Sequence, residues 1–365
     1  MRDVIVVGGG VIGLSIAHAV AAEGSSVLVL DPGETTEASS WAAAGMLAPQ
    51  SEADRNDPLF NLCAASLHLY RDWAALLREQ SGVDPEYEEP GLLYLATSEE
   101  SLEVMKRRMI WQREAGFDSE LRTPEEIRRM EPHLTLPIAG GIYMPGEYQV
   151  TPRRLMDALR GACKLSRVEI RNGERVLEIV RRGDRVDGVR TESGSIAAAT
   201  VVIASGARSS QITGLCPRLP VTPRKGQILS LKTPAPMFQR LIRWEHAYLM
   251  QRRGGELVVG ATNEDVGFDR SLTPSGIGGL LDRVQQLSSC TAKLAIKEMW
   301  TGLRPSTPDG LPVLGHAANG LIYATGHYRN GILLAPITAS IVSALVMNRP
   351  SPIPLEPYSP SRFEV

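Results

Sequence analysis

Two patterns of apolar positions follow one another at the start of the chain. Asp3–Val7 is a short β-branched run, typical of a strand buried on both faces, and it leads directly into a glycine turn. From Val11 to Glu23 the apolar side chains recur at helical spacing, and Gly24 ends this pattern. A second buried strand, Val27–Leu30, ends at Asp31. The pattern therefore predicts one βαβ unit.

Later apolar runs predict how this unit is extended. Thr200–Ser205 and Leu321–Thr325 are buried strands followed by glycine, whereas Gly91–Ala96, Gly226–Leu231 and Glu256–Gly260 are typical of an antiparallel sheet. The sequence predicts an α/β protein in which a second, α+β domain with a largely antiparallel sheet is inserted into a Rossmann-like domain. The expected boundaries are 1–82, 145–222 and 300–365 for the dinucleotide domain and 83–144 and 223–299 for the substrate domain.

Two uncharged stretches could be mistaken for membrane segments, but their residues argue against this interpretation. Val4–Ala22 contains three consecutive glycines that would break an apolar helix, and Arg2 before it is offset by Asp3, which disfavours a signal peptide. Gly331–Met347 is shorter than the ~20 residues of a membrane span and contains Pro336. It is predicted to be a buried helix that begins near Gly331. With no targeting segment expected, the predicted location is the cytoplasm.

Composition narrows the class of protein. With 365 residues against ~100–200 for a typical domain, two domains are expected. The net charge is −2, from 39 Lys and Arg against 41 Asp and Glu, and no basic stripe is interleaved with aromatics, so nucleic acid is not the expected partner. The cysteines Cys63, Cys163, Cys216 and Cys290 form no C-x-x-C pair, which predicts a reducing compartment and no structural metal.

The glycine turn carries the first candidate chemistry. Gly8 allows the tight turn, Gly10 lets a pyrophosphate approach the backbone, and Gly13 lets the helix pack closely on the strand. Asp31, at the end of the second strand, is placed to accept the ribose hydroxyls of an adenosine, and an acid there disfavours a 2′-phosphate. The unit therefore predicts FAD or NAD rather than NADP. A purely structural glycine turn is the alternative.

Five motifs taken together extend this interpretation over the whole chain. They are V-I-V-V-G-G-G-V-I-G at the N-terminus, S-S-W-A-A-A-G-M-L at Ser39–Leu47, V-V-I-A-S-G-A, W-T-G-L-R-P-S-T-P-D-G-L-P-V-L-G at Trp300–Gly315, and G-H-Y-R-N-G-I-L-L-A-P at Gly326–Pro336. In combination they resemble the D-amino-acid-oxidase-type flavoproteins, and within that group the glycine oxidases of thiamine biosynthesis.

The resemblance implies an FAD-dependent oxidative deamination of glycine, and of sarcosine or small D-amino acids, by hydride transfer to flavin N5. Oxygen would be the acceptor, and glyoxylate, ammonia and hydrogen peroxide the products, with iminoacetate as a supply for thiazole synthesis. It also implies a homo-oligomer, a tetramer, and a thiazole synthase as partner. Other readings stay open: a D-amino-acid or sarcosine oxidase, a dehydrogenase with a quinone acceptor, or a non-catalytic flavin-binding regulatory protein. The order of substrates is open as well.

The resemblance also assigns site residues. It places Arg304 and Arg329 on the substrate carboxylate, Tyr248 in the active site, His246 near the pocket mouth and Met46 beside the substrate. Asn263 stands where some relatives have methionine, so its role is open. The cofactor contacts implied are Gly8, Gly10, Val11, Ile12, Gly13, Asp31, Pro32, Ser39, Ser40, Ala44, Gly45, Met46, Val176, Gly206, His327, Tyr328, Arg329, Asn330, Gly331, Ile332 and Leu333.

Several of these residues have plainer readings. Arg304 could pair with Asp309 on the surface, Arg329 could be a solvated turn residue, and Tyr248 could simply pack in the sheet. His327 is expected to pack at a strand end, and no residue is nominated as an acid or base, because hydride transfer from a bound neutral amine needs positioning above all. Since no cysteine follows Cys290, where related sarcosine oxidases attach the flavin, FAD is expected to be non-covalent.

Overall fold

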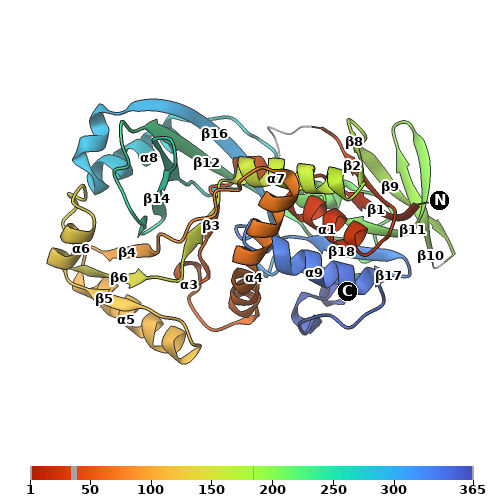
Figure 1. Ribbon diagram of the computed structural model, residues 1–365, viewed down its shortest axis with the longest axis horizontal. Coiled ribbons are helices and arrows are strands. Elements are labelled where there is room, and N and C mark those ends of the chain that lie inside the picture. Colours follow the sequence, from red (N-terminus) through yellow and green to blue (C-terminus); the bar gives the residue numbers. More distant parts are fainter. Residues whose placement is uncertain (1, 34–38, 184, 364–365) are drawn as a thin grey trace.

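A computed structural model describes residues 2–33, 39–183 and 185–363 and places them around two large sheets (Figure 1). The strands of the first sheet are β1 (Arg2–Val7), β2 (Val27–Asp31), β8 (Glu169–Asn172), β9 (Val176–Arg182), β10 (Arg185–Thr191), β11 (Gly194–Ile203), β17 (Val313–Ala318) and β18 (Leu321–Thr325). Their order is β17-β18-β11-β1-β2-β8, and β10 and β9 extend β11. The pairs from β18 to β8 are parallel, whereas β17 is antiparallel to β18. This confirms the Rossmann-like prediction.

The centre of this sheet is β1, which pairs with β2 on one side and β11 on the other. Val4–Val7 are all buried, as expected for a β-branched run covered on both faces. One face is covered by four mutually packed helices, two of which, α1 and α9, lie side by side in Figure 1. These helices are α1 (Val11–Ala22), α4 (Pro58–Ser81), α7 (Pro152–Leu165) and α9 (Ala335–Val346).

Several element ends differ from the prediction, among them the starts of β11 and β12 (Thr222–Lys232), which lie at Gly194 and Thr222. Helix α9 begins at Ala335 and not at Gly331, because residues 331–334 form turns and Pro336, which has no N–H to donate, fits only the first turn of a helix. Strand β11 ends at Ile203 and not at Ser205. After the end of β11, Gly206, with a φ of +56°, begins the 3₁₀ helix η2 (Gly206–Gln211).

The second sheet has the order β16-β12-β15-β14-β13-β4-β6-β5. Every pairing in it is antiparallel except that of β13 with β4, which confirms the largely antiparallel substrate part. The strands are β4 (Leu92–Ala96), β5 (Glu120–Arg122), β6 (Gly140–Met144), β12 (Thr222–Lys232), β13 (Leu241–Trp244), β14 (Ala247–Arg252), β15 (Glu256–Gly260) and β16 (Ala295–Ser306).

Helices also pack against the second sheet, and short helices and strands lie between the two sheets (Figure 1). α8 packs on β12, β14 and β15, while α5 and α6 contact β6. The helices are α5 (Glu99–Glu114), α6 (Pro124–Met130) and α8 (Pro274–Leu287), and the short elements are α2 (Ser39–Ala42), β3 (Met46–Leu47), α3 (Pro49–Glu52) and β7 (Tyr148–Gln149). The remaining 3₁₀ turns are η3 (Ser289–Lys293), η4 (Glu356–Tyr358) and η5 (Pro360–Phe363).

The chain passes between the two sheets several times, as an inserted domain requires. β16 belongs to the second sheet along its whole length, so the boundary expected between residues 299 and 300 falls inside a strand. The division into 1–82, 145–222 and 300–365 against 83–144 and 223–299 stays a prediction. Within the described ranges, no helix combines the length and the apolar character that crossing a bilayer would need.

Candidate functional site

The turn between β1 and α1 depends on its glycines. Gly8 has a φ of +110°, a backbone conformation that other residues rarely adopt. A Cβ on Gly13 would lie 1.8 Å from the carbonyl oxygen of Gly8, so only glycine allows the helix to approach the turn. The first turn of α1 carries no acidic side chain. The helix therefore presents its positive end to the cavity without an internal counter-charge, which suits a phosphate.

Asp31 is fixed at the end of β2. Its Oδ2 accepts the backbone N–H of Gly9 at 2.6 Å, and its Oδ1 accepts that of Gly33 at 2.8 Å. A carboxylate oxygen can accept more than one hydrogen bond, so these contacts orient the group and still leave lone pairs facing the cavity that Asp31 lines. This is the arrangement that an adenosine ribose requires.

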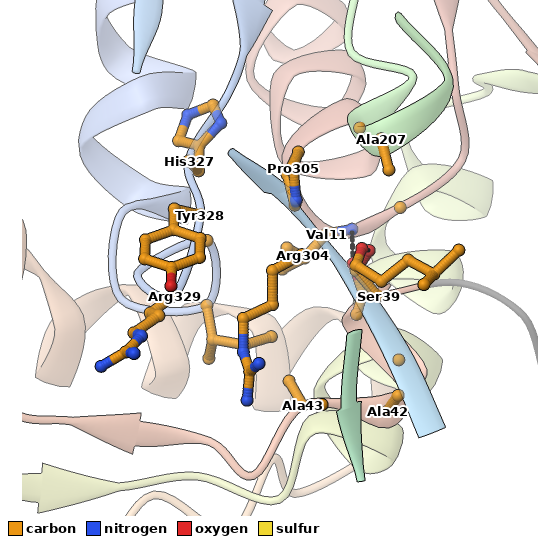
Figure 2. A pocket seen from close by; sticks show the side chains of 18 of the residues that line it. Val11, Ser39, Ala42, Ala43, Ala207, Arg304, Pro305, His327, Tyr328 and Arg329 are labelled. Atoms are coloured by element: carbon orange, nitrogen blue, oxygen red, sulfur yellow. Dashed lines mark hydrogen bonds between the residues drawn. The ribbon is translucent and has the colours of Figure 1, made fainter. Parts of the chain in front are cut away.

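The segment 39–46 closes the next part of the cavity. The Ser40 hydroxyl accepts the N–H of Val11 at 2.9 Å, shown as a dashed line in Figure 2. The Ser39 hydroxyl donates to the carbonyl of Leu303, and Trp300 Nε1 donates to the carbonyl of Ala42 at 2.9 Å. This segment is therefore held between helix α1 and strand β16 of the second sheet.

These elements enclose one cavity of about 1070 Å³. Of the residues expected from the sequence, two do not line it. Gly13 is buried behind the turn, and Leu333 is a core residue whose carbonyl accepts the Ser66 hydroxyl at 2.6 Å. The expected residues that do line it are Gly8, Gly10, Val11, Ile12, Asp31, Pro32, Ser39, Ser40, Ala44, Gly45, Met46, Val176, Gly206, His246, Tyr248, Asn263, Arg304, His327, Tyr328, Arg329, Asn330, Gly331 and Ile332.

Arg304 extends from β16 into the same part of the cavity as Tyr328 and Arg329 (Figure 2). Its guanidinium lies over Gly226, where a Cβ would come within 2.4 Å, and Nη1 donates to the carbonyl of Thr262 at 3.1 Å. The surface pair considered for Arg304 does not form, because Asp309 pairs with Arg362 at 2.7 Å. Arg304 therefore keeps donors for a ligand in the cavity.

Tyr248 faces the cavity from β14. Its ring lies against Gly260 on the neighbouring strand, where a Cβ would collide with the phenol oxygen at 2.2 Å. Burial raises the pKa of Tyr248 to about 12, so the hydroxyl is a neutral hydrogen-bond donor at physiological pH. An uncharged donor beside Arg304 is suited to an anionic ligand.

Two charged residues beside Arg329 were not expected from the sequence. Glu52, at the end of α3, pairs with Arg243 of β13 and lies 3.6 Å from Arg329. Burial would raise the pKa of Glu52, but the charges of Arg243 and Arg329 outweigh burial and lower it, so the group is an ionised partner and not a base. Together with Arg304, these residues form a cluster of three cations and one anion. A substrate carboxylate would reduce the excess of positive charge in this cluster.

The two histidines of the cavity differ in environment. His327 is buried, its Nε2 lies 3.1 Å from the Thr338 hydroxyl, and burial lowers its pKa to about 3, so the ring is neutral. It lies apart from Arg304 and Arg329 in Figure 2, in keeping with a packing role. His246 is exposed at the cavity. Asn263 is exposed as well, and its Oδ1 accepts the Tyr328 hydroxyl at 3.2 Å.

Neither a metal nor a thiol enters this geometry. In the described part of the chain, no three His, Cys, Asp or Glu side chains gather as a metal site. All four cysteines fall in the described ranges and none lines the cavity. The glycine turn, the free positive end of α1 and the oriented Asp31 fit an adenine dinucleotide without any covalent link to cysteine.

Comparisons with known proteins agree with this geometry. A family model described as FAD dependent oxidoreductase matches residues 3–345. The glycine oxidase of Geobacillus kaustophilus is 36% identical over 373 residues, which cover 99% of this chain and 97% of that protein. Its crystal structure superposes with a TM-score of 0.94 over 98% of each chain. The bifunctional protein ThiO/ThiG of Trichormus variabilis is also 36% identical, over all of this chain and 55% of that protein. The chain thus spans about half the length of that relative.

Proposed function

Because the chain belongs to the family of FAD-dependent oxidoreductases, we propose that it is a glycine oxidase, which deaminates glycine and related small amino acids with oxygen as acceptor. The observation that carries this proposal is the cationic cluster of Arg304, Arg329 and Arg243 beside Tyr248 in the cavity that also holds the dinucleotide turn. A small α-amino acid has the carboxylate that this cluster lacks. The glycine oxidase of Geobacillus kaustophilus, similar over nearly the whole chain, supports the same substrate.

FAD fits the residues present, and when bound it accepts a hydride from the substrate and passes the electrons to oxygen, giving hydrogen peroxide. Gly8, Gly10 and the N-terminus of α1 would hold its pyrophosphate, and Asp31 the ribose. Segment 39–46 and the residues from His327 to Ile332 would enclose the rest. The other predicted cofactor contacts are proposed on the same ground.

The substrate's position follows from the arginines. Arg304 would bind the carboxylate through parallel, charge-assisted hydrogen bonds, with Tyr248 as a neutral donor beside it and Arg329 as a second cation. Fixing the carboxylate in this way orients the Cα–H bond, and orientation is the main protein contribution to hydride transfer. Neither the paired Glu52 nor the neutral His327 is assigned as an acid or base.

The overall reaction is balanced without a further co-reactant. Glycine loses a hydride from Cα and a proton from nitrogen to give iminoacetate, and water converts this to glyoxylate and ammonia. Iminoacetate could instead pass to a thiazole synthase, which stays the predicted partner. The bifunctional ThiO/ThiG relative is a precedent for joining such a chain to a second protein. Homotetramer formation is proposed from the resemblance alone, and the cytoplasmic location stays a prediction.

The test is the reaction of the yellow protein with a panel of amines: glycine, sarcosine, N-ethylglycine, D-alanine and D-proline. We expect glycine to bleach the flavin absorbance without oxygen, and to consume oxygen and release hydrogen peroxide in air. Faster bleaching by D-alanine or D-proline would favour a D-amino-acid oxidase, and faster bleaching by sarcosine a sarcosine oxidase. Bleaching without oxygen uptake would indicate a dehydrogenase. A flavin that no amine bleaches would overturn the proposal and favour a regulatory flavoprotein.

A further inference from the structure

Arg252, at the end of β14, is a buried charge that the proposed reaction does not use. Its exposed fraction is 6%, and it does not line the cavity. Nη1 donates to the carbonyl of Val150 and, at 3.3 Å, to the Thr151 hydroxyl, while Nη2 donates to the carbonyl of Ala44. These acceptors are uncharged, and the carboxylates of Glu256, Glu86 and Glu88 favour the charged form only through their nearby charges. Burying a cation whose hydrogen bonds go to neutral acceptors is costly, so its retention calls for an explanation.

One acceptor carbonyl, that of Ala44, belongs to the wall of the cofactor cavity, and the other, that of Val150, lies directly behind this wall. Ala44, Gly45 and Met46 line the cavity, and the carbonyl of Gly45 accepts the N–H of Val150 at 3.0 Å. Gly45 has a φ of +92°, and a Cβ on it would lie 2.3 Å from the Val150 oxygen, so the wall passes directly against Val150. Arg252 joins the two segments of this contact, because it donates to the carbonyls of both Ala44 and Val150.

The same strand carries a substrate-side residue. Side chains two positions apart on a strand share a face, so Tyr248, Met250 and Arg252 project from one side of β14. Tyr248 and Met250 pack in the same cluster as Ala44 and Met46. A guanidinium at the third position of this face ties the cofactor wall to the strand that presents Tyr248.

We propose that Arg252 is a positioning residue for FAD, which fixes Ala44–Met46 as the cavity wall and places a positive charge behind it. The planar guanidinium accounts for these contacts, because its two terminal nitrogens donate to two carbonyls at once. The charge has a separate consequence. Reduction adds electrons to the cofactor, and a buried cation nearby stabilises the reduced form. Burial lowers the pKa of Arg252 to about 10, which leaves it charged at neutral pH.

Two variants separate the fork from the charge. Arg252→Lys keeps the charge and loses the fork, whereas Arg252→Gln keeps one donor group and loses the charge. Arg253→Gln is the matched control, since Arg253 is the next residue and its exposed side chain pairs with Glu88 and Asp84. For each protein, we would measure the FAD dissociation constant by titrating the apoprotein, the flavin absorption spectrum and the flavin midpoint potential.

We expect both Arg252 variants to raise the FAD dissociation constant about tenfold or more, because each leaves a carbonyl of the wall without its donor. The midpoint potential should shift to a more negative value in Arg252→Gln and stay near that of the wild type in Arg252→Lys. Arg253→Gln should match the wild type in all three readouts. Activity toward any amine is not needed, so the test stands whether or not glycine is the substrate.

A merely structural arginine would give another result. Folded variants that bind FAD within twofold of the wild type, with unchanged spectrum and potential, would overturn the proposal even if they unfold more easily in urea. A raised dissociation constant with an unchanged potential in Arg252→Gln would support the clamp and overturn the electrostatic role. If Arg252→Gln does not fold, the dissociation constant of Arg252→Lys decides whether the clamp exists.

Discussion

At the scale of single residues, the charges around the cavity are unequal in number. The part of the lining that the structure describes contains seven arginines, among them Arg243, Arg304 and Arg329, but two acids, Asp31 and Glu52. A bound pyrophosphate and a substrate carboxylate would offset much of this excess. Tight binding of both ligands is therefore expected to depend on ionic strength wherever an arginine is exposed, as Arg329 is.

Arg304 gives the sharpest residue-level prediction. Arg304→Ala should raise the KM for glycine on the order of 10²-fold, because two charge-assisted hydrogen bonds are lost, and should also lower kcat through misorientation of Cα. Arg304→Lys should recover part of the loss, since an ammonium has no planar fork. Steady-state kinetics with a wild-type flavin spectrum as the folding control test this. A near wild-type KM in Arg304→Ala would transfer the main anchor to Arg329.

Asn263 also lines the cavity, next to Tyr328. Its Oδ1 is engaged by the Tyr328 hydroxyl, so its amide N–H groups remain as donors at the cavity. Asn263→Met should shift relative activity between glycine and bulkier or N-alkylated amines while FAD binding stays intact. Tyr328→Phe removes the same hydrogen bond and keeps the amide. A shift in Asn263→Met alone assigns the effect to the amide, a shift in both assigns it to the position of Tyr328, and no shift removes Asn263 from the pocket wall.

At the scale of elements, loop 264–273 between β15 and α8 covers part of the cavity with Phe268 and Arg270. The loop is held by Lys225 of β12, which is 1% exposed. Its Nζ lies 3.1 Å from Glu264 and 3.4 Å from Asp269, and it donates to the carbonyl of Ser271 at 3.1 Å. Burial would lower the pKa of Lys225, but these partners outweigh burial and raise it. The loop is therefore a fixed wall, anchored by Lys225 and also by the buried Gln227, whose amide donates to Glu264 and Thr273 at 2.9 Å.

Lys225→Met should accordingly loosen this wall. Removing the cation that joins the partly exposed Glu264, the exposed Asp269 and the Ser271 carbonyl should lower the free energy of unfolding and expose the loop to proteases. Arg224→Gln is the control on the adjacent position, because Arg224 pairs with Asp265 at the surface, where such pairs contribute about 0–1 kcal/mol. Urea unfolding and limited proteolysis measure both effects. Equal behaviour of the two variants would show that Lys225 does not anchor the loop.

The short helix α3 is hydrogen-bonded to a buried carboxyl group, that of Glu147, whose pKa is raised to about 7. Glu147 is fully buried, its Oε1 accepts the N–H groups of Gln50 at 2.6 Å and Ser51 at 3.2 Å, and burial raises its pKa to about 7. The folded pKa is above the ordinary value, so this group's contribution to stability is complete at low pH and is lost as the pH rises through 7. Between pH 5 and 8, the loss should be about 3 kcal/mol.

Glu147→Gln should remove this slope. The measurement is the free energy of unfolding in urea at pH 5 and pH 8 for wild type and variant, compared as a difference so that other titrating groups cancel. Glu125→Gln provides a control, since Glu125 is exposed on α6. If the wild type and Glu147→Gln lose the same stability over this range, Glu147 is ionised in the folded protein.

At the scale of the whole molecule, the parts predictable from sequence are those coded locally. The βαβ unit, Gly8 and Asp31 lie within one short stretch, so periodicity and turn chemistry were sufficient. Glu52 and Arg243 could not be predicted, because each has an ordinary surface reading and only the packing of α3 against β13 pairs them. The start of α9 was misplaced, because Gly331–Leu334 continue the apolar pattern of a helix that Pro336 delays.

The state of the cofactor is a property of the whole molecule as well. Since no cysteine lines the cavity, the purified protein should be yellow and should release intact FAD when precipitated with acid. Absorbance of the supernatant and of the redissolved chain measures this release. Flavin retained on the chain would contradict the non-covalent assignment, and a colourless protein that binds NAD alone would contradict the cofactor itself.

The strand order has a consequence for biosynthesis. β1 pairs with β2, which follows it closely in the chain, but its other partner β11, and β18 beside β11, are made much later. At ~5–20 residues per second, the delay between β1 and β18 is roughly 15–65 s. His327–Ile332, which complete the cavity, emerge later still. The cavity can therefore be completed only after His327–Ile332 have been made, and until β11 is made one edge of β1 has no strand partner.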